Sequence, residues 1–163
     1  MITETEGDLL AAQVQALVNP VNTVGVMGKG LALQFRRAYP AMFKSYLQAL
    51  QQRTLRIGTV QVWPTGRTSP PLWIINVPTK QHWRQPSRLA YVQSGLAALV
   101  EAVNQHAISS IAVPALGCGN GGLPWEQVRQ LIAQTFANLP DLDVRLYRPG
   151  VTDISQDGRL DLA

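Results

Sequence analysis

The chain has 163 residues, a length that suits one domain with a single core. Hydrophobic residues make up 46%, which excludes global disorder, and a single cysteine excludes an internal disulfide. With only two histidines beside that cysteine we expect no metal site and no cofactor. The acidic start and the absence of a membrane-length apolar run lead us to expect a cytoplasmic protein without a membrane partner.

The charges are distributed unevenly along the chain. The formal net charge is +4, yet no carboxylate stands between Asp8 and Glu101. That stretch carries ten cations: Lys29, Arg36, Arg37, Lys44, Arg53, Arg56, Arg67, Lys80, Arg84 and Arg88. Such an asymmetry favours a polyanionic partner, although cations spread over several faces for solubility would give the same count.

The N-terminal part begins with two short strands and a broken helix. We expect strands at residues 2–6 and 16–19, the second ended by the Asn19-Pro20 turn signal. Residues 31–52 show the apolar spacing of a helix, interrupted at Pro40.

Strands and helices then alternate. Strands at 59–63 and 72–77 each stop at a proline, and a helix with one apolar stripe follows over 89–103, with Ser87 as its N-cap. A strand at 110–114 leads into a glycine-rich loop.

The C-terminal third continues this order. A helix with Pro124 in its first turn comes after the glycine-rich loop, and 144–147 forms the last strand. We expect one domain over 1–150 and a polar tail, or the start of a linker, over 151–163.

Strands interleaved with helices predict an α/β fold of three layers, α/β/α, around a mixed and largely parallel sheet. In such sheets ligands bind where loops leave the carboxyl ends of the strands. The loops after Asn19, after Val77 and after Pro114 are therefore the candidates for a site.

The first of these loops is rich in glycine and leads directly into a helix. It reads Asn-Pro-Val-Asn-Thr-Val-Gly-Val-Met-Gly-Lys-Gly from Asn19 to Gly30. The free amides at the start of the next helix suit a phosphate group. Asn22 could bind ribose hydroxyls or hold its own turn, and Lys29 could contact phosphate or solvent.

The second loop places four glycines within six residues, as Gly-Cys-Gly-Asn-Gly-Gly from Gly117 to Gly122. Two glycine-rich loops in one small α/β domain indicate a diphosphate held from both sides. Cys118 could be a nucleophile paired with His82, or a small residue that fills a crowded loop.

The third loop combines cations with an aromatic side chain. His82, Trp83, Arg84 and Arg88 are candidates for contact with single-stranded nucleic acid, through base stacking and phosphate contacts. The alternative is that Trp83 packs on the domain and the arginines are solvated.

Four motifs in their order and spacing resemble the macrodomain family: Gly-Asp-Leu-Leu from Gly7, Val-Asn-Pro-Val-Asn from Val18, Gly-Lys-Gly from Gly28 and the second loop. Within it the chain is similar to the terminal ADP-ribose protein glycohydrolases. It is most similar to the DarG-type antitoxin macrodomains, through Val-Pro-Thr-Lys from Val77 and Met-Gly-Lys-Gly from Met27.

The resemblance implies which residues bind ADP-ribose. Asp8 and Leu9 would take the adenine, and the distal ribose would lie beside Pro20–Asn22. The two loops and Thr79 complete the implied set: Asp8, Leu9, Pro20, Val21, Asn22, Gly28, Lys29, Gly30, Leu31, Thr79, Gly117, Cys118, Gly119, Asn120, Gly121 and Gly122.

The resemblance also implies that Lys80 is catalytic. Gly121 stands where the protein glycohydrolases have an aspartate, which argues against transfer of their ester-cleaving activity. Glycosidic cleavage usually employs carboxylates, and this loop offers none. A lysine acts only when neutral, and we expect His82, Arg84 and the loop backbone to lower its pKa.

The resulting prediction is a glycohydrolase that removes ADP-ribose from thymine bases of single-stranded DNA, reversing the action of a DarT-type ADP-ribosyltransferase toxin. Three alternatives remain at this point: a reader that binds ADP-ribose without turnover, a hydrolase acting on modified protein, and a general nucleic-acid-binding module. In the main prediction and in the first two alternatives, ADP-ribose is the ligand or product, and not a cofactor.

Overall fold

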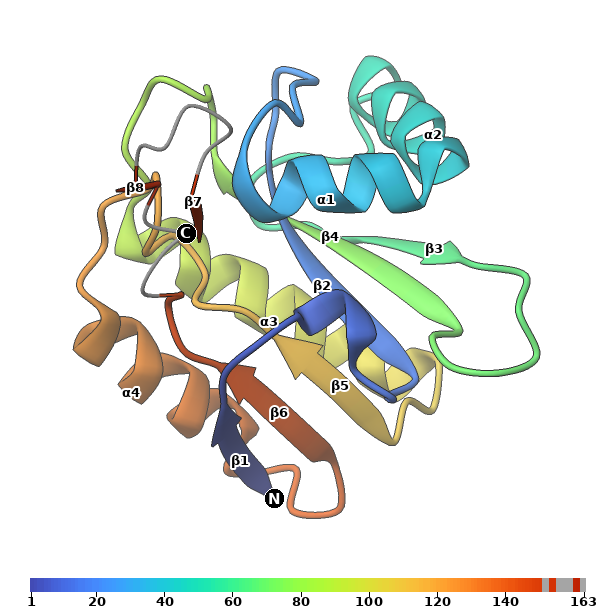
Figure 1. Cartoon of the computed structure of the whole chain (residues 1–163). Coiled ribbons are helices and arrows are strands. Elements are labelled where there is room, and N and C mark those ends of the chain that lie inside the picture. The colour runs from blue at the N-terminus through green and yellow to red at the C-terminus, as the bar shows by residue number, and fades with distance from the viewer. Residues whose placement is uncertain (151–152, 155–159, 162–163) are drawn as a thin grey trace.

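The computed structural model describes residues 1–150, 153–154 and 160–161 (Figure 1). The strands of its large sheet are β1 (Ile2–Thr5), β2 (Ala16–Asn22), β3 (Gln61–Pro64), β4 (Trp73–Lys80), β5 (Ser110–Val113) and β6 (Asp143–Tyr147). The helices are α1 (Gly30–Ala38), α2 (Pro40–Gln51), α3 (Leu89–Gln105) and α4 (Trp125–Phe136), with a short 3-10 helix, η1, at Leu9–Ala11.

The large sheet has the strand order β1-β6-β5-β2-β4-β3. Neighbouring strands are parallel except for β3, which pairs antiparallel with β4. Helices α1 and α2 cover one face, and α3 and α4 cover the other (Figure 1). The predicted three-layer α/β/α fold with a mixed, largely parallel sheet is therefore confirmed.

Alternate residues of the buried strands supply two separate cores. Val18 of β2 and Ile75 of β4 belong to the cluster that contains α3 and α4, whereas Leu17 and Ile74 belong to the cluster that contains α1, α2 and η1. Because side chains alternate across a strand, a continuously apolar segment is what a sheet covered on both faces requires.

A row of buried and half-buried amides runs across the strands on the α1 and α2 face of the sheet. Asn19 Nδ2 donates to Asn76 Oδ1 at 3.0 Å, Asn76 Nδ2 donates to Gln61 Oε1 at 2.9 Å, and Gln61 Nε2 donates to Ser45 Oγ at 3.0 Å. Buried polar groups need such partners, so the row links β2, β4, β3 and α2 in one register.

Two strands run further than the sequence predicts, and each continues through a proline. β2 extends to Asn22 through Pro20, and β4 extends to Lys80 through Pro78. The two strands pair with each other along almost their whole length, so the loss of one N–H donor at each proline is tolerated. Thr79 and Lys80 consequently lie on a strand, and not in a loop.

The predicted N-cap at Ser87 is wrong. Arg88 occupies the N-cap of α3 and makes no side-chain capping hydrogen bond. Ser87 is instead buried against the second glycine-rich loop, where its backbone N donates to Gly121 O at 2.9 Å.

The predicted tail lies largely outside the described residues. Its described parts are β7 (Asp153–Ile154) and β8 (Leu160–Asp161), which pair antiparallel. Within the part of the chain that the structure describes, none of the helices has the length and apolar character needed to cross a membrane.

Candidate active-site cleft

A cleft of about 1240 Å³ opens at the carboxyl ends of β2, β4 and β5. β2 pairs with β5 only at Ala16 and Leu17, so the two strands separate beyond that point. From β2 the chain passes to β4 over the α1 and α2 face, and from β5 it passes to β6 over the α4 face. Such a reversal between adjacent strands is where open α/β sheets bind ligands.

The cleft brings together most of the predicted site residues. Its lining consists of Glu6, Gly7, Asp8, Leu9, Pro20, Val21, Asn22, Val26, Gly28, Lys29, Gly30, Leu31, Ala32, Gln34, Thr79, Lys80, Trp83, Arg84, Ser87, Pro114, Ala115, Gly117, Gly119, Asn120, Gly121, Tyr147, Arg148, Pro149 and Gly150. Of the predicted residues, Cys118, Gly122, His82 and Arg88 are not part of it. Ligand pockets usually measure about 300–1,000 Å³, so this cleft has room for a large ligand.

The first loop is held in place by the side chain of Asn22. Its Oδ1 accepts from the backbone N of Val24 at 3.1 Å and of Val26 at 3.2 Å, and its Nδ2 donates to Val26 O at 2.6 Å. Asn22 thus holds its own turn, one of the two roles left open from the sequence.

Tyr46 of α2 also holds the same loop in place. Its single hydroxyl proton is shared between the backbone O of Asn22, at 2.7 Å from the hydroxyl oxygen, and Asn22 Oδ1, at 3.0 Å. Burial raises the pKa of Tyr46 above its ordinary value, so the hydroxyl keeps its proton and remains a donor.

Helix α1 begins at the floor of the cleft. Gly30 has a φ of +55°, a conformation that favours glycine and turns the chain into the helix. Gly30, Leu31 and Ala32 line the cleft, and no acidic residue stands in this first turn. Their free amides and the helix dipole suit an anionic group.

The second loop is closed by backbone hydrogen bonds. Leu123 N donates to Gly117 O at 2.9 Å, and Ser87 N donates to Gly121 O, so the loop folds against the segment before α3. Unlike α1, helix α4 does not begin in the cleft, because Pro124 and Trp125 are absent from its lining. This loop therefore offers its backbone to a ligand, without a helix start behind it.

Gly121 has no space for a side chain. A Cβ at this position would lie 2.4 Å from Gly117 O and 2.4 Å from Ser87 Oγ. The loop conformation therefore leaves no room at Gly121 for an aspartate, the residue that the resemblance to the protein glycohydrolases implies for this loop. Packing excludes a carboxylate at this one position.

Asp8 and Leu9 mark one end of the cleft. Asp8 is exposed, and its Oδ1 caps η1 by accepting from Leu10 N at 3.0 Å. Arg148 stabilises this end, since its side chain donates to Glu4 at 3.3 Å and to Glu6 at 2.8 Å. Among the described residues, Glu6 and Asp8 are the only carboxylates in the cleft lining.

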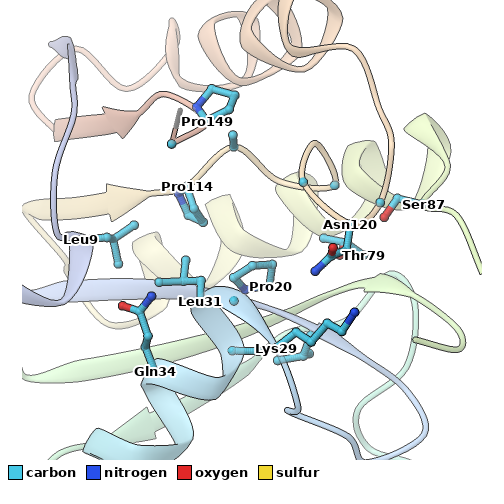
Figure 2. A pocket seen from close by; sticks show the side chains of 18 of the residues that line it. Leu9, Pro20, Lys29, Leu31, Gln34, Thr79, Ser87, Pro114, Asn120 and Pro149 are labelled. Carbon is cyan, nitrogen blue, oxygen red and sulfur yellow. The ribbon is translucent and has the colours of Figure 1, made fainter. Parts of the chain in front are cut away.

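Lys80 marks the opposite end, at the last position of β4 and in register with Asn22. Figure 2 shows Leu9 and Gln34 toward one side of the cleft and Lys29, Thr79 and Asn120 toward the other. The Lys80 amine lies 3.4 Å from Trp83 O. Partial burial, and then the positive charge of Lys29, lower the pKa of Lys80 below its ordinary value of 10.5.

The source of this charge differs from the prediction. We expected His82 and Arg84 to act on Lys80, but Lys29 is the cation that does so. His82 does not line the cleft, and its Nδ1 accepts from the backbone N of Arg84 at 3.0 Å. No pattern along the chain indicates this effect, because Lys29 at the N-cap of α1 and Lys80 at the end of β4 are brought near each other only by the tertiary packing.

The third loop presents a partly exposed aromatic cluster. The Trp83 side chain is 43% exposed, its ring centroid lies 5.3 Å from that of His82, and the Arg84 guanidinium lies 4.6 Å from its ring. Trp83 is thus neither buried in the domain nor free of contacts. Arg88 faces away from the cleft, 5.8 Å from the ring of Tyr91.

The cysteine is unsuited to nucleophilic chemistry at neutral pH. Burial raises the pKa of Cys118 to about 11, so the thiol keeps its proton. Its Sγ lies 3.7 Å from Leu116 O, and His82 is occupied elsewhere. The reading of Cys118 as a residue that fills a crowded loop fits this geometry.

Several lining residues were missed from the sequence. Gln34 lies one turn beyond Gly30 on α1, a spacing that could have revealed it. Ser87, Tyr147 and Pro149 gave no signal, since they reach the cleft only through loop packing and through the end of β6. Among the described residues, no cluster of three His, Cys, Asp or Glu side chains could hold a metal ion.

Comparison with known proteins places this cleft in a family. The Macro domain family model matches residues 18–132. DNA ADP-ribosyl glycohydrolases of Mycobacterium tuberculosis and Thermus aquaticus are 52% and 48% identical over 149 residues. These alignments cover 91% of this chain but 42% and 41% of those proteins, so the chain spans less than half of their length.

Comparison with solved structures leads to the same family. The macrodomain of M. tuberculosis DarG superposes with a TM-score of 0.90 at 52% identity, covering 92% of this chain and 99% of that one. Thermosipho africanus DarTG in complex with ADP-ribose gives 0.86 at 34% identity, covering 91% and 41%. The chain therefore belongs to the macro domain family and, within it, stands with the DarG macrodomains.

Proposed function

We propose that the chain is an ADP-ribosyl glycohydrolase that removes ADP-ribose from thymine bases of single-stranded DNA. The observation that carries this proposal is an amine of lowered pKa, Lys80, at the end of the cleft opposite its carboxylates. The names of the M. tuberculosis and T. aquaticus relatives support DNA as the carrier of the ADP-ribose.

In this proposal the parts of ADP-ribose lie in succession along the cleft. Adenine would lie at Asp8 and Leu9, where one carboxylate oxygen remains available beside an apolar contact. The diphosphate would lie between the first turn of α1 and the backbone of the second loop, which supply N–H donors without a nearby carboxylate. The distal ribose would then reach Pro20 and Thr79, with its anomeric carbon beside Lys80.

Lys80 would act on that carbon as a nucleophile. The neutral amine forms an Nζ–C1″ bond as the bond from C1″ to the thymine nitrogen breaks. The proton lost by Nζ passes to that thymine nitrogen. Ring opening gives an imine, and water hydrolyses it to release ADP-ribose and the free lysine. If Lys80 serves as a general base instead, it takes a proton from a water whose oxygen bonds to C1″ as the bond from C1″ to thymine breaks. Lys80 then returns that proton to the thymine nitrogen, and no covalent adduct forms.

We also propose a partner protein for this chain. An ADP-ribosyltransferase of the DarT type would supply the modified strand, and the chain would act as its cytoplasmic antitoxin. Fusion of the two activities in a protein of T. africanus, named a DNA ADP-ribosyl transferase-DNA ADP-ribosyl glycohydrolase fusion protein, supports this pairing.

The test compares wild type with Lys80→Ala on thymine-ADP-ribosylated single-stranded DNA. We expect release of ADP-ribose to fall by about 100-fold or more, while the Kd for ADP-ribose changes by less than about threefold. Lys44→Ala, at an exposed lysine of α2, is the matched control and should keep full activity.

Full activity of Lys80→Ala would refute the catalytic assignment. Binding of ADP-ribose without turnover by wild type would identify a reader, and preferential turnover of ADP-ribosylated protein would identify a different carrier. Borohydride added during turnover should trap a covalent adduct on Lys80 if the amine is the nucleophile, and should trap nothing if it is a base.

A further inference from the structure

We propose that a second hollow, directly beyond Lys80, binds the phosphodiester and nucleotide that adjoin the modified base. The inference rests on the proposed function, because it extends the path of the strand away from the reacting bond. It assigns a binding role to Arg56 and Gln81, which the sequence did not single out, and a specific place to His82.

The hollow measures about 580 Å³ and is open to solvent. Three separate segments form it: the loop after β2, the connection from α2 to β3, and the segment after β4. Its lining consists of Thr23, Val24, Arg56, Ile57, Gln81, His82 and Gln85.

The hollow and the cleft are lined by residues that are adjacent in sequence. Asn22 and Lys80 line the cleft, whereas their immediate neighbours Thr23 and Gln81 line the hollow. The backbone N and the Oγ1 of Thr23 both donate to Gln81 O, at 3.3 and 2.9 Å, and fix the divide between the two spaces. Consecutive residues therefore face the two spaces.

The chemistry of the reaction sets the direction of the strand. The bond to be cut joins the sugar of ADP-ribose, which fills the cleft, to a base that is still attached to its strand. The strand must therefore leave the reacting centre on the side away from the bound nucleotide. Lys80 stands at that limit, and the hollow begins one residue further along.

The charges around the hollow suit a phosphodiester. All seven lining residues come from the stretch between Asp8 and Glu101, which has no carboxylate. Arg56 uses one guanidinium nitrogen, Nη1, to donate to Arg53 O at 3.2 Å, which leaves further N–H donors for a ligand. Anionic oxygens accept strongly from such a donor set.

His82 adds a ring N–H donor. Its Nδ1 accepts from Arg84 N, so the ring carries its proton on Nε2. The amide side chains of Gln81 and Gln85 offer both donors and acceptors for a neighbouring base. The stacked rings of His82 and Trp83 lie where the hollow meets the cleft, since the first lines one and the second lines the other.

The experiment uses two substrates, thymidine bearing ADP-ribose with no flanking nucleotide and a single-stranded oligonucleotide of about ten nucleotides with one modified thymine. For Arg56→Ala we expect KM on the oligonucleotide to rise about tenfold, with a shallower dependence of log KM on log salt. Turnover of the modified thymidine and the Kd for free ADP-ribose should stay at wild-type values.

Arg67→Ala is the matched control. Arg67 is an exposed arginine of the same carboxylate-free stretch, but it lies in the β3–β4 connection, at the end of β4 opposite Lys80 (Figure 1). It should match wild type on both substrates. Arg56→Lys, which keeps the charge, should recover part of the affinity for the oligonucleotide.

The inference is overturned if Arg56→Ala and Arg67→Ala behave alike, or if Arg56→Ala impairs both substrates equally. Failure of the proposed function is a different result, in which wild type releases ADP-ribose from neither substrate. In that event, fluorescence anisotropy with the modified oligonucleotide in the Lys80→Ala background still decides whether Arg56 contributes to strand binding.

Discussion

Both loops of the cleft are rich in glycine, yet they are built in different ways. The loop after β2 is held by side chains: Asn22 bonds its backbone, and Tyr46 bonds Asn22. The loop after β5 is held by backbone bonds, from Leu123 N to Gly117 O and from Ser87 N to Gly121 O.

The same residue type therefore has different roles in the two loops. At Gly30 a glycine provides a positive φ that starts a helix toward the ligand. At Gly121 it provides space, because any side chain would collide with Gly117 and Ser87. The first loop also places the charge of Lys29 near Lys80, whereas the second loop lines the cleft mainly with its backbone.

The largest effect is expected from placing a side chain at Gly121. Gly121→Ala should destabilise the fold by about 3 kcal/mol and abolish ADP-ribose binding, because its methyl group would sit 2.4 Å from a backbone oxygen. Chemical denaturation and calorimetric titration would measure the two effects.

Gly122→Ala is the matched control for that substitution. It has a φ of +76° but nothing within 4 Å of its added Cβ, so only a backbone cost of about 1 kcal/mol is expected. Equal losses at Gly121 and Gly122 would mean that backbone conformation, and not space, distinguishes this loop.

A smaller effect is expected from loosening the first loop. Tyr46→Phe removes the hydroxyl that bonds Asn22 and leaves buried acceptors with fewer donors, at a cost of about 1–2 kcal/mol in the free energy of unfolding. The Kd for ADP-ribose should rise a few-fold as the loop loses order. An unchanged Kd would show that Asn22 holds the loop without help from α2.

The contribution of Lys29 should appear in the pH dependence. Removing its charge in Lys29→Gln raises the pKa of Lys80, so less of the amine is neutral at a given pH. The rise of kcat with pH should move to higher pH, and kcat at neutral pH should fall. Lys44→Gln should leave the profile in place, and identical profiles for wild type and Lys29→Gln would contradict the role of Lys29.

The smallest effect is expected at Cys118. Its thiol does not line the cleft and stays protonated, with a pKa of about 11. Cys118→Ala should keep kcat/KM within about twofold of wild type. A loss of 100-fold or more would show that the second loop acts through a side chain after all.

Local patterns were sufficient for the order of the elements and for the three candidate loops, whereas the individual cleft residues came mostly from the resemblance to macrodomains. Between Asp8 and Gly121 the lining also contains six residues that neither source predicted: Val26, Ala32, Gln34, Ser87, Pro114 and Ala115. The predicted ends of two strands, before Pro20 and before Pro78, were wrong. Pairing of β2 with β4 continues past both prolines and outweighs their preference for turns.

The amino-acid sequence by itself determined the order of elements, the two-sided core, the carboxylate-free stretch and the motifs of the cleft, because each follows from neighbours along the chain. The tertiary structure alone decided that Lys29 acts on Lys80, that Gly121 has no room for a carboxylate, and that Arg56 shares a hollow with His82. These depend on distances between segments far apart in sequence, which only the packing of strands and loops can set.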